Sequence, residues 1–145
     1  MSGLMENCAT TAKGEHVVMI PARMSKLERD IRTALRFHEA DNRHDVPGMM
    51  SLGADDCVME SSVPPPDGPT LAGKESVGRW WRKYFAGTRD AQRQIEDAFS
   101  LGIRCVLRWP GEWTDLKGIP RAMRGVDIYQ VKESQIAEIL SYVKG

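Results

Sequence analysis

Two stretches of the chain carry apolar residues at helical spacing. Ser25 and Glu28 have the spacing of a capping box, in which each side chain satisfies a backbone N–H of the other, so a helix is expected to begin there. The face that follows carries Leu27, Ile31, Ala34, Leu35 and His38. A second helix is expected from about Gly73 to Gly87, with the apolar face Val77, Trp80, Trp81, Tyr84 and Phe85.

The other segments favour a short helix and then strands. Asp45 is placed to cap a short helix that Gly53 ends. The expected strands are 55–60, 95–101, 103–109, 121–131 and 136–143, and the loops between them include 61–69 and 110–120. Glu133 and Ser134 separate the last two strands, which predicts a hairpin. Helices followed by an antiparallel meander indicate an α+β fold.

The composition indicates one domain with no charge excess. Its 145 residues suffice for a single domain, expected at 25–145 after a tail, 1–24, that shows no clear period. The 20 Lys and Arg balance the 20 Asp and Glu, which argues against a nucleic-acid partner. No apolar stretch is long enough for a signal peptide or a membrane span, so we expect a cytoplasmic protein. An odd set of cysteines (Cys8, Cys57 and Cys105) favours free thiols.

The common cofactor and metal motifs are missing from the sequence. It contains neither GxGxxG nor GxxxxGK[ST], so no dinucleotide site or P-loop is indicated. His16, His38 and His44 form no HxH or HExxH pair, which argues against a zinc site. Chemistry without a cofactor or metal is therefore expected.

Asp127 is the main candidate for acid–base chemistry. It lies in the apolar run GVDIYQV and shares its strand face with Met123, Tyr129 and Val131. A carboxylate on a half-buried face loses hydration, which suits it to proton transfer if no cation compensates it. In the alternative, this face is solvated, or the carboxylate pairs with Arg104, Arg108 or Arg124.

Other polar and aromatic residues are weaker candidates. His38 interrupts the apolar stripe of the first helix, where a histidine bonded to a backbone carbonyl is the simpler interpretation. Glu60 ends the first strand, where it is either at a pocket mouth or a surface carboxylate. Trp80 and Trp81, with Trp109, suit the wall of an apolar ligand pocket, although core packing is the commoner role for such residues.

Four segments in one order point to a known family. They are RFHEADNRHDVPGMMSLGADDCVME, LAGKESVGRWW, MRGVDIYQV and QIAEILSYV. This arrangement, over about 25–144, resembles the SnoaL-like group of the nuclear transport factor 2-like superfamily. That superfamily also contains ketosteroid isomerases, polyketide cyclases, limonene epoxide hydrolases and scytalone dehydratases. The resemblance is specific for the fold and poorly specific for activity.

The resemblance implies a cone-shaped α+β barrel. In such a barrel, long helices pack in a strongly curved, mainly antiparallel sheet that encloses an apolar pocket, and many relatives dimerise through the outer sheet face. Asp127 falls at the position of a pocket aspartate, with His38 or Glu60 as a helper. The implied pocket wall is Phe37, Met59, Trp80, Trp81, Trp109, Met123 and Tyr129.

The chain departs from several relatives at their functional positions. The isomerase base falls on Ser61 and the isomerase tyrosine falls on Phe37. The epoxide hydrolases use an Arg and two Asp around one water, a set that the sequence does not assemble, and Ser141 stands where they have a carboxylate. A cyclase-like enzyme acting by acid–base catalysis on an apolar, carbonyl-bearing molecule is therefore the leading hypothesis. A non-catalytic binding module is the alternative, and epoxide hydrolysis is a weaker one.

Overall fold

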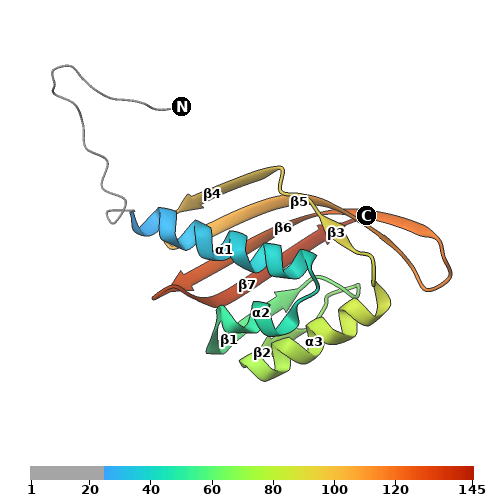
Figure 1. The fold of residues 1–145 in the computed structure, drawn as a ribbon, viewed down its shortest axis with the longest axis horizontal. Helices are drawn as coiled ribbons and strands as arrows, with labels where there is room; N and C mark the ends of the chain where they lie inside the picture. Colours follow the sequence, from blue (N-terminus) through green and yellow to red (C-terminus); the bar gives the residue numbers. More distant parts are fainter. Residues whose placement is uncertain (1–24) are drawn as a thin grey trace, which may run out of the picture.

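The computed structural model describes residues 25–145, and the tail predicted at 1–24 lies outside the described residues. Three helices, α1 (Lys26–Asn42), α2 (Val46–Ser51) and α3 (Lys74–Gly87), pack on a seven-stranded sheet (Figure 1). The strands are β1 (Gly53–Ser61), β2 (Thr70–Ala72), β3 (Gln92–Arg93), β4 (Asp97–Leu101), β5 (Arg104–Thr114), β6 (Pro120–Lys132) and β7 (Gln135–Lys144). The α+β prediction is confirmed.

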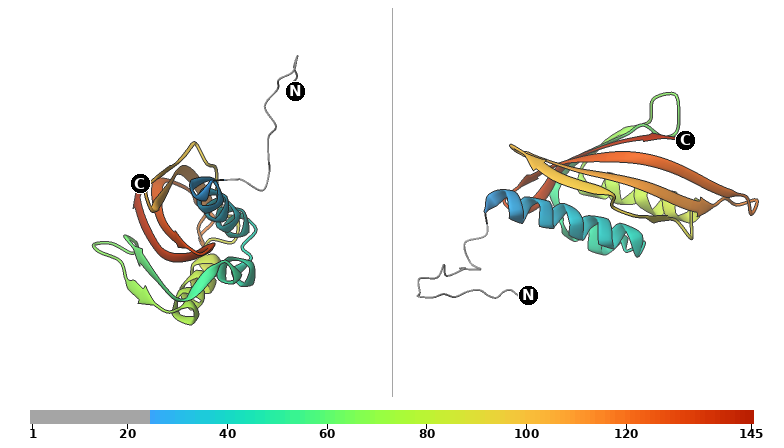
Figure 2. Two further views of the ribbon diagram at one scale, coloured as in Figure 1. Left: turned by 90° about the vertical axis from the view of Figure 1, so that its left-hand side faces the viewer. Right: turned by 90° about the horizontal axis from the view of Figure 1, so that it is seen from above.

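The sheet is mixed but mainly antiparallel. Its strand order is β2-β1-β7-β6-β5-β3, and β4 pairs with β5 beyond the end of β3. Only the β1–β7 pair among the described strands is parallel. Helix α1 packs along β4 to β7 and α3 packs on β1 and β2, so the two long helices lie over different parts of the sheet (Figure 2).

The predicted element ends agree with the local chemistry. The Ser25 hydroxyl accepts from the Glu28 N–H at 3.1 Å, and the Glu28 carboxylate accepts from the Ser25 N–H at 2.9 Å. These two bonds form the predicted capping box. Glu133 and Ser134 both have positive φ, as a tight two-residue turn between β6 and β7 requires.

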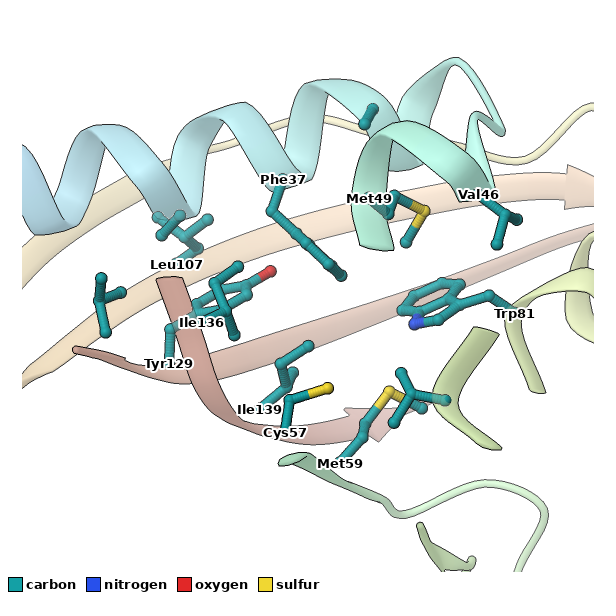
Figure 3. Packing of buried hydrophobic residues seen from close by; sticks show 14 of the residues in the cluster. Phe37, Val46, Met49, Cys57, Met59, Trp81, Leu107, Tyr129, Ile136 and Ile139 are labelled. Carbon is teal, nitrogen blue, oxygen red and sulfur yellow. The ribbon is translucent and has the colours of Figure 1, made fainter. Parts of the chain in front are cut away.

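The buried core lies between the helices and the inner sheet face. Phe37 of α1 contacts the ring edges of Trp81 and Tyr129, with centroids 6.2 and 5.8 Å apart. Around them lie buried aliphatic and sulfur-containing side chains from α2, β1, β5 and β7 (Figure 3), among them Met49, Cys57, Met59, Leu107, Ile136 and Ile139. Cys57 and Cys105 are buried free thiols, as predicted.

The loop predicted at 110–120 is wrong, because β5 and β6 continue until only 115–119 connect them. Pro110 is tolerated inside β5 because of the strand edge that it faces. The nitrogen and the carbonyl of a strand residue point to the same side, and in Pro110 both point to residues 94–96, which connect β3 to β4. There the Gln94 N–H donates to the Pro110 carbonyl, so no ladder donor is required from Pro110.

The strand predicted at 95–101 is shorter, and β4 turns its small residues rather than its large apolar residues inward. Phe99 and Leu101 are 47% and 75% exposed, whereas Ala98 and Ser100 are half-buried. Helix α1 packs on β4, and the face with small residues leaves room for that helix. Alternation along the strand does not by itself reveal which face the helix covers. The short strands β2 and β3 were not predicted, since each is too brief to show a period.

Candidate functional site

The inner face of β6 presents Asp127 to the helices. Its burial alternates along the strand, and the buried side is formed by Gly125, Asp127, Tyr129 and Val131. Asp127 is 3% exposed. The carboxylate therefore faces the layer between sheet and helices rather than solvent, on the strand face that the sequence predicts.

Three side chains hold the Asp127 carboxylate. The Ser141 hydroxyl, directly across on β7, donates to Oδ1 at 2.7 Å. The Tyr129 hydroxyl makes a long contact of 3.5 Å with Oδ2, and Nη1 of Arg93 lies 3.9 Å from the same oxygen. A hydrogen bond on one oxygen and a cation near the other orient the carboxylate.

Arg93 is the cation that compensates Asp127, which corrects the expectation of an uncompensated carboxylate. Its side chain is 7% exposed, and its guanidinium makes a 2.9 Å ion pair with Asp41 and donates to the Tyr84 hydroxyl at 3.1 Å. It also lies 4.3 Å from the centre of the Trp109 ring.

The three arginines that the sequence offered as partners of Asp127 pair elsewhere. Arg104 binds Glu138, while Arg108 and Arg124 both bind Glu96. Arg104, Arg108 and Arg124 occupy outward positions of β5 and β6, so the pleat directs them away from the inner face.

The charges of Asp41, Arg93 and Asp127, the buried ionic cluster, do not balance. Two carboxylates and one guanidinium give a formal charge of −1 when both acids are ionised. Burial raises the pKa of Asp41 above its ordinary value of 3.8; the Arg93 charge opposes that rise and the Asp127 charge adds to it. The cluster therefore binds a proton more readily than a solvated aspartate does.

Neighbouring groups respond to the same charges. Burial raises the pKa of Tyr129 well above 10, and the negative charges of Asp127 and Asp41 raise it further, so its phenol stays neutral. Burial by itself lowers the pKa of Arg93. The charges of Asp41, Tyr84 and Asp127 raise this pKa by more, so the guanidinium stays protonated. The site thus combines one fixed cation, one fixed neutral phenol and two carboxyl groups.

Helix α1 holds the backbone of Arg93 in place. Nε2 of His38 lies 3.2 Å from the Arg93 carbonyl oxygen, and the Asn42 amide donates to the same oxygen at 2.7 Å. Asn42 also accepts from the Arg93 N–H at 2.9 Å. His38 is therefore a buried histidine bonded to a backbone carbonyl, the simpler of its two interpretations.

The other predicted site residues are placed in three regions. Phe37, Met59, Trp81 and Tyr129 share the buried core, and Trp109 is fully buried beside Arg93. Trp80 and Met123 are half-buried. The structure does not bring Glu60 together with Asp127. The Glu60 side chain lies on the outer sheet face, and its carboxylate accepts from the Tyr142 hydroxyl at 3.1 Å.

Four hollows on residues 25–145 are open to the surface, and Asp127 lines none of the four, so the enclosed pocket that the resemblance implies is not among them. One of about 780 Å³ lies on the outer sheet face, lined by Glu96, Arg108, Arg124, Gly125, Val126, Tyr142, Val143 and Lys144. Within the same residues, no group of three His, Cys, Asp or Glu side chains is arranged to hold a metal ion. No helix in this part of the chain is long and apolar enough to cross a membrane.

Sequence reasoning missed Arg93, Asp41 and Tyr84. Asp41 had a detectable signal, since it lies three residues after His38 on the buried stripe of α1. Tyr84 was assigned to the apolar face of its helix without a polar role. Arg93 had no signal, because it lies in a two-residue strand whose position depends on pairing with β5.

Comparison with protein families places the chain among domains of known fold. The model of the SnoaL-like domain matches residues 34–139, which includes Asp41, Arg93 and Asp127. The search of curated proteins found no match.

Solved structures similar to this chain include three from bacteria. A nuclear transport factor 2-like protein of unknown function from Mesorhizobium loti is 30% identical, with 84% of this chain and 96% of that chain covered and a TM-score of 0.68. A protein with a ketosteroid isomerase-like fold from Catenulispora acidiphila, solved with trimethylamine, is 15% identical (76% and 83% covered, TM-score 0.69). A candidate SnoaL-like polyketide cyclase from Shewanella denitrificans is 17% identical (79% and 90% covered, TM-score 0.70). The last two likenesses concern the fold alone.

Proposed function

Because the chain belongs to the SnoaL-like domain family, we propose that it is a cofactor-independent small-molecule enzyme. In this proposal Asp127 is the general acid/base for isomerisation or cyclisation of an apolar, carbonyl-bearing substrate. The observation that carries it is the buried ionic cluster, in which the two carboxyl groups of Asp41 and Asp127 share one guanidinium inside the protein.

The proposed step is a proton transfer at carbon. The Asp127 carboxylate removes a proton from the carbon next to the substrate carbonyl, and the electron pair moves to the carbonyl oxygen to form an enolate. Return of that proton to a different carbon completes an isomerisation. Attack of the enolate on a second carbonyl carbon instead closes a ring, and the alkoxide formed there takes the proton back from Asp127. Ser141 orients the carboxylate, and His38 is a positioning residue through Arg93. Such a base contributes about 10²–10⁴-fold in rate.

Hydrolysis of an epoxide is a second candidate, favoured by one observation. Arg93 lies between Asp41 and Asp127, and this supplies the Arg and the two Asp that sequence reasoning could not assemble. In this candidate Asp127 takes a proton from water as the water oxygen attacks an epoxide carbon. Asp41, whose pKa burial raises, protonates the leaving oxygen.

Deuterium exchange tests the first candidate directly. A panel of cyclic and aryl ketones is incubated with the protein in D₂O, and loss of the proton next to the carbonyl is followed by ¹H NMR. Asp127→Asn keeps the shape and the Ser141 contact but removes the base, so exchange should fall at least about 100-fold. Asp97→Asn, an exposed aspartate on β4, is the matched control and should leave exchange unchanged.

Other outcomes select between the alternatives. Ketones that bind without Asp127-dependent exchange would contradict the proposed enzyme and favour the non-catalytic binding module. Asp127-dependent incorporation of ¹⁸O from labelled water into the diol of an aryl epoxide, with no ketone exchange, would favour hydrolysis instead. Circular dichroism of each variant verifies that it is folded.

A further inference from the structure

Residues 88–93 follow α3 and end with the short strand β3 (Figure 1). Arg93, the last of them, holds its guanidinium near Asp41 and Asp127 and 4.3 Å from the centre of the Trp109 ring. Asp127 lines none of the four hollows on the described residues, so a ligand reaches it only when a neighbouring element moves. Residues 88–93 are the candidate for this movement, because they supply the cation of the buried ionic cluster.

One side chain of α1 takes the place of a neighbouring strand beside β3. The Asn42 side chain accepts from the Arg93 N–H at 2.9 Å and donates to the Arg93 carbonyl oxygen at 2.7 Å. A paired strand would satisfy a backbone N–H and carbonyl in the same way. On the other side, β3 pairs with β5 through Gln92 and Arg93. The strand is therefore held by two residue pairs on one side and by a side chain on the other.

Two more side chains tie residues 88–93 to their surroundings. Nε2 of His44 lies 2.9 Å from the Ala91 carbonyl oxygen, and the His44 ring stacks on Phe85 with centroids 4.2 Å apart. The Asp90 carboxylate accepts from the Thr114 N–H at 2.7 Å in an exposed position. Contacts of this kind break without disrupting the long strand ladders. A segment with few backbone pairs opens at a lower free energy than the core strands do.

We propose that residues 88–93 form a lid over the buried ionic cluster, and that opening of the lid both admits a ligand and withdraws Arg93 from Asp127. This inference rests on the proposed function, since it concerns access to the same site, and it goes further by naming the element that moves. In the closed state the guanidinium compensates Asp41 and Asp127. In the open state these two carboxyl groups face the entering ligand.

Hydrogen exchange followed by ¹H–¹⁵N NMR tests the lid without a ligand. Two lid protons report on opening: the backbone N–H of Arg93, bonded to Asn42, and the indole N–H of Trp109, buried beside Arg93. The backbone N–H of Tyr129, in the central strand β6, reports on global unfolding. After correction for intrinsic rates, both lid protons should exchange at least about tenfold faster than that of Tyr129. Equal protection of all three protons would overturn the proposal.

Asn42→Ala tests the bonds that close the lid. The change removes both hydrogen bonds to the Arg93 backbone, so the two lid protons should exchange about 10–100-fold faster. Gln94→Ala removes an exposed side-chain amide next to Arg93 and is the matched control, which should leave both rates unchanged. Unchanged lid protons in a folded Asn42→Ala protein would contradict the proposal.

Val131→Ala separates local opening from global unfolding. Val131 is buried in β6, in a part of the sheet that stays folded when the lid opens. Its truncation should accelerate exchange at Tyr129 by at least about tenfold and leave the two lid protons unchanged. Acceleration of all three protons by the same factor would show that the lid protons exchange only through global unfolding. This comparison decides the question even if Asn42→Ala does not fold.

Failure of the lid can be distinguished from failure of the proposed function. Local opening without Asp127-dependent deuterium exchange of any ketone would leave the lid standing and remove the enzyme. Asp127-dependent ketone exchange, with lid protons that exchange only through global unfolding, would support the enzyme and remove the lid.

Discussion

Arg93 is a buried cation whose partners come from three separate elements. Asp41 lies on α1, Tyr84 on α3 and Asp127 on β6, and each contacts the guanidinium. Taking these charges out of water is costly, and the cost is offset only while every partner is present. The cluster is therefore a sensitive point for stability as well as a candidate site.

Arg93→Met tests the energetic role of the cluster. The change leaves two carboxyl groups buried without a cation, so the free energy of unfolding should fall by about 3–5 kcal/mol. Arg108→Met removes an exposed arginine paired with Glu96 and should cost about 0–1 kcal/mol. Urea denaturation measures both, and equal losses in the two variants would contradict the assignment.

Asp41 should make stability depend on pH in a defined direction. Burial raises its pKa in the folded state above 3.8, so the folded protein keeps a proton that the unfolded chain has lost. Its stabilising contribution is present at low pH and is lost as pH rises from about 3.8 through the raised pKa.

The comparison with Asp41→Asn isolates this effect. The wild type minus variant difference in free energy of unfolding should decrease between about pH 4 and the folded pKa and then level off. His38, Arg93 and Asp127 face Asp41 in both proteins. Urea denaturation at several pH values measures the difference, and a difference that grows with pH would refute the raised pKa.

At the scale of elements, the β5–β6 pair positions the site. Gly125 pairs with Trp109 across the ladder, and the absence of a side chain at Gly125 lets the indole lie flat against β6. The indole in turn supports the Arg93 guanidinium. A long hairpin with one glycine thus creates the surface on which the buried cation rests.

Gly125→Ala should disturb this arrangement. Its Cβ would lie 2.3 Å from the Trp109 ring, so the ring or the strand must move, at a cost of about 1–3 kcal/mol. Gly87→Ala, at the end of α3 with open space around its Cβ position, is the control and should be neutral or slightly stabilising. Thermal denaturation followed by near-ultraviolet circular dichroism reports both stability and the tryptophan environment.

For the whole molecule, the two sheet faces differ in what covers them. Helices cover the inner face, whereas the outer face carries the hollow lined by Arg124, Val126 and Tyr142. We propose that two copies of the chain associate through this outer face, as the family resemblance implies. A stable pair would bury more than about 1,000 Å² in total.

Sedimentation velocity tests this association. The wild type should sediment as a dimer at micromolar concentration, and Val126→Glu, which places a charge on the outer face, should shift it to monomer. Leu116→Glu, at the exposed turn between β5 and β6, should remain dimeric. A monomeric wild type would contradict the proposal.

The sequence by itself determined the helices, the α+β class and the residues that share a strand face with Asp127, whereas the structure showed that this face points inward. These features depend on local signals, such as the Ser25–Glu28 box, the spacing of apolar residues in α3 and the alternation along β6. Each signal lies within one element, so it can be recognised without knowing which other elements pack against it.

Only the tertiary structure decided which cation meets Asp127 and which residues complete the site. Arg93 reaches the carboxylate because β3 pairs with β5, and Asp41 joins because α1 packs on the same sheet face. Contacts between residues more than 30 positions apart leave no period in the chain. Arg104, Arg108 and Arg124 were therefore predicted as partners of Asp127, because they are near it in the sequence or in the predicted strands. Strand pleating directs all three to the outer face of the sheet.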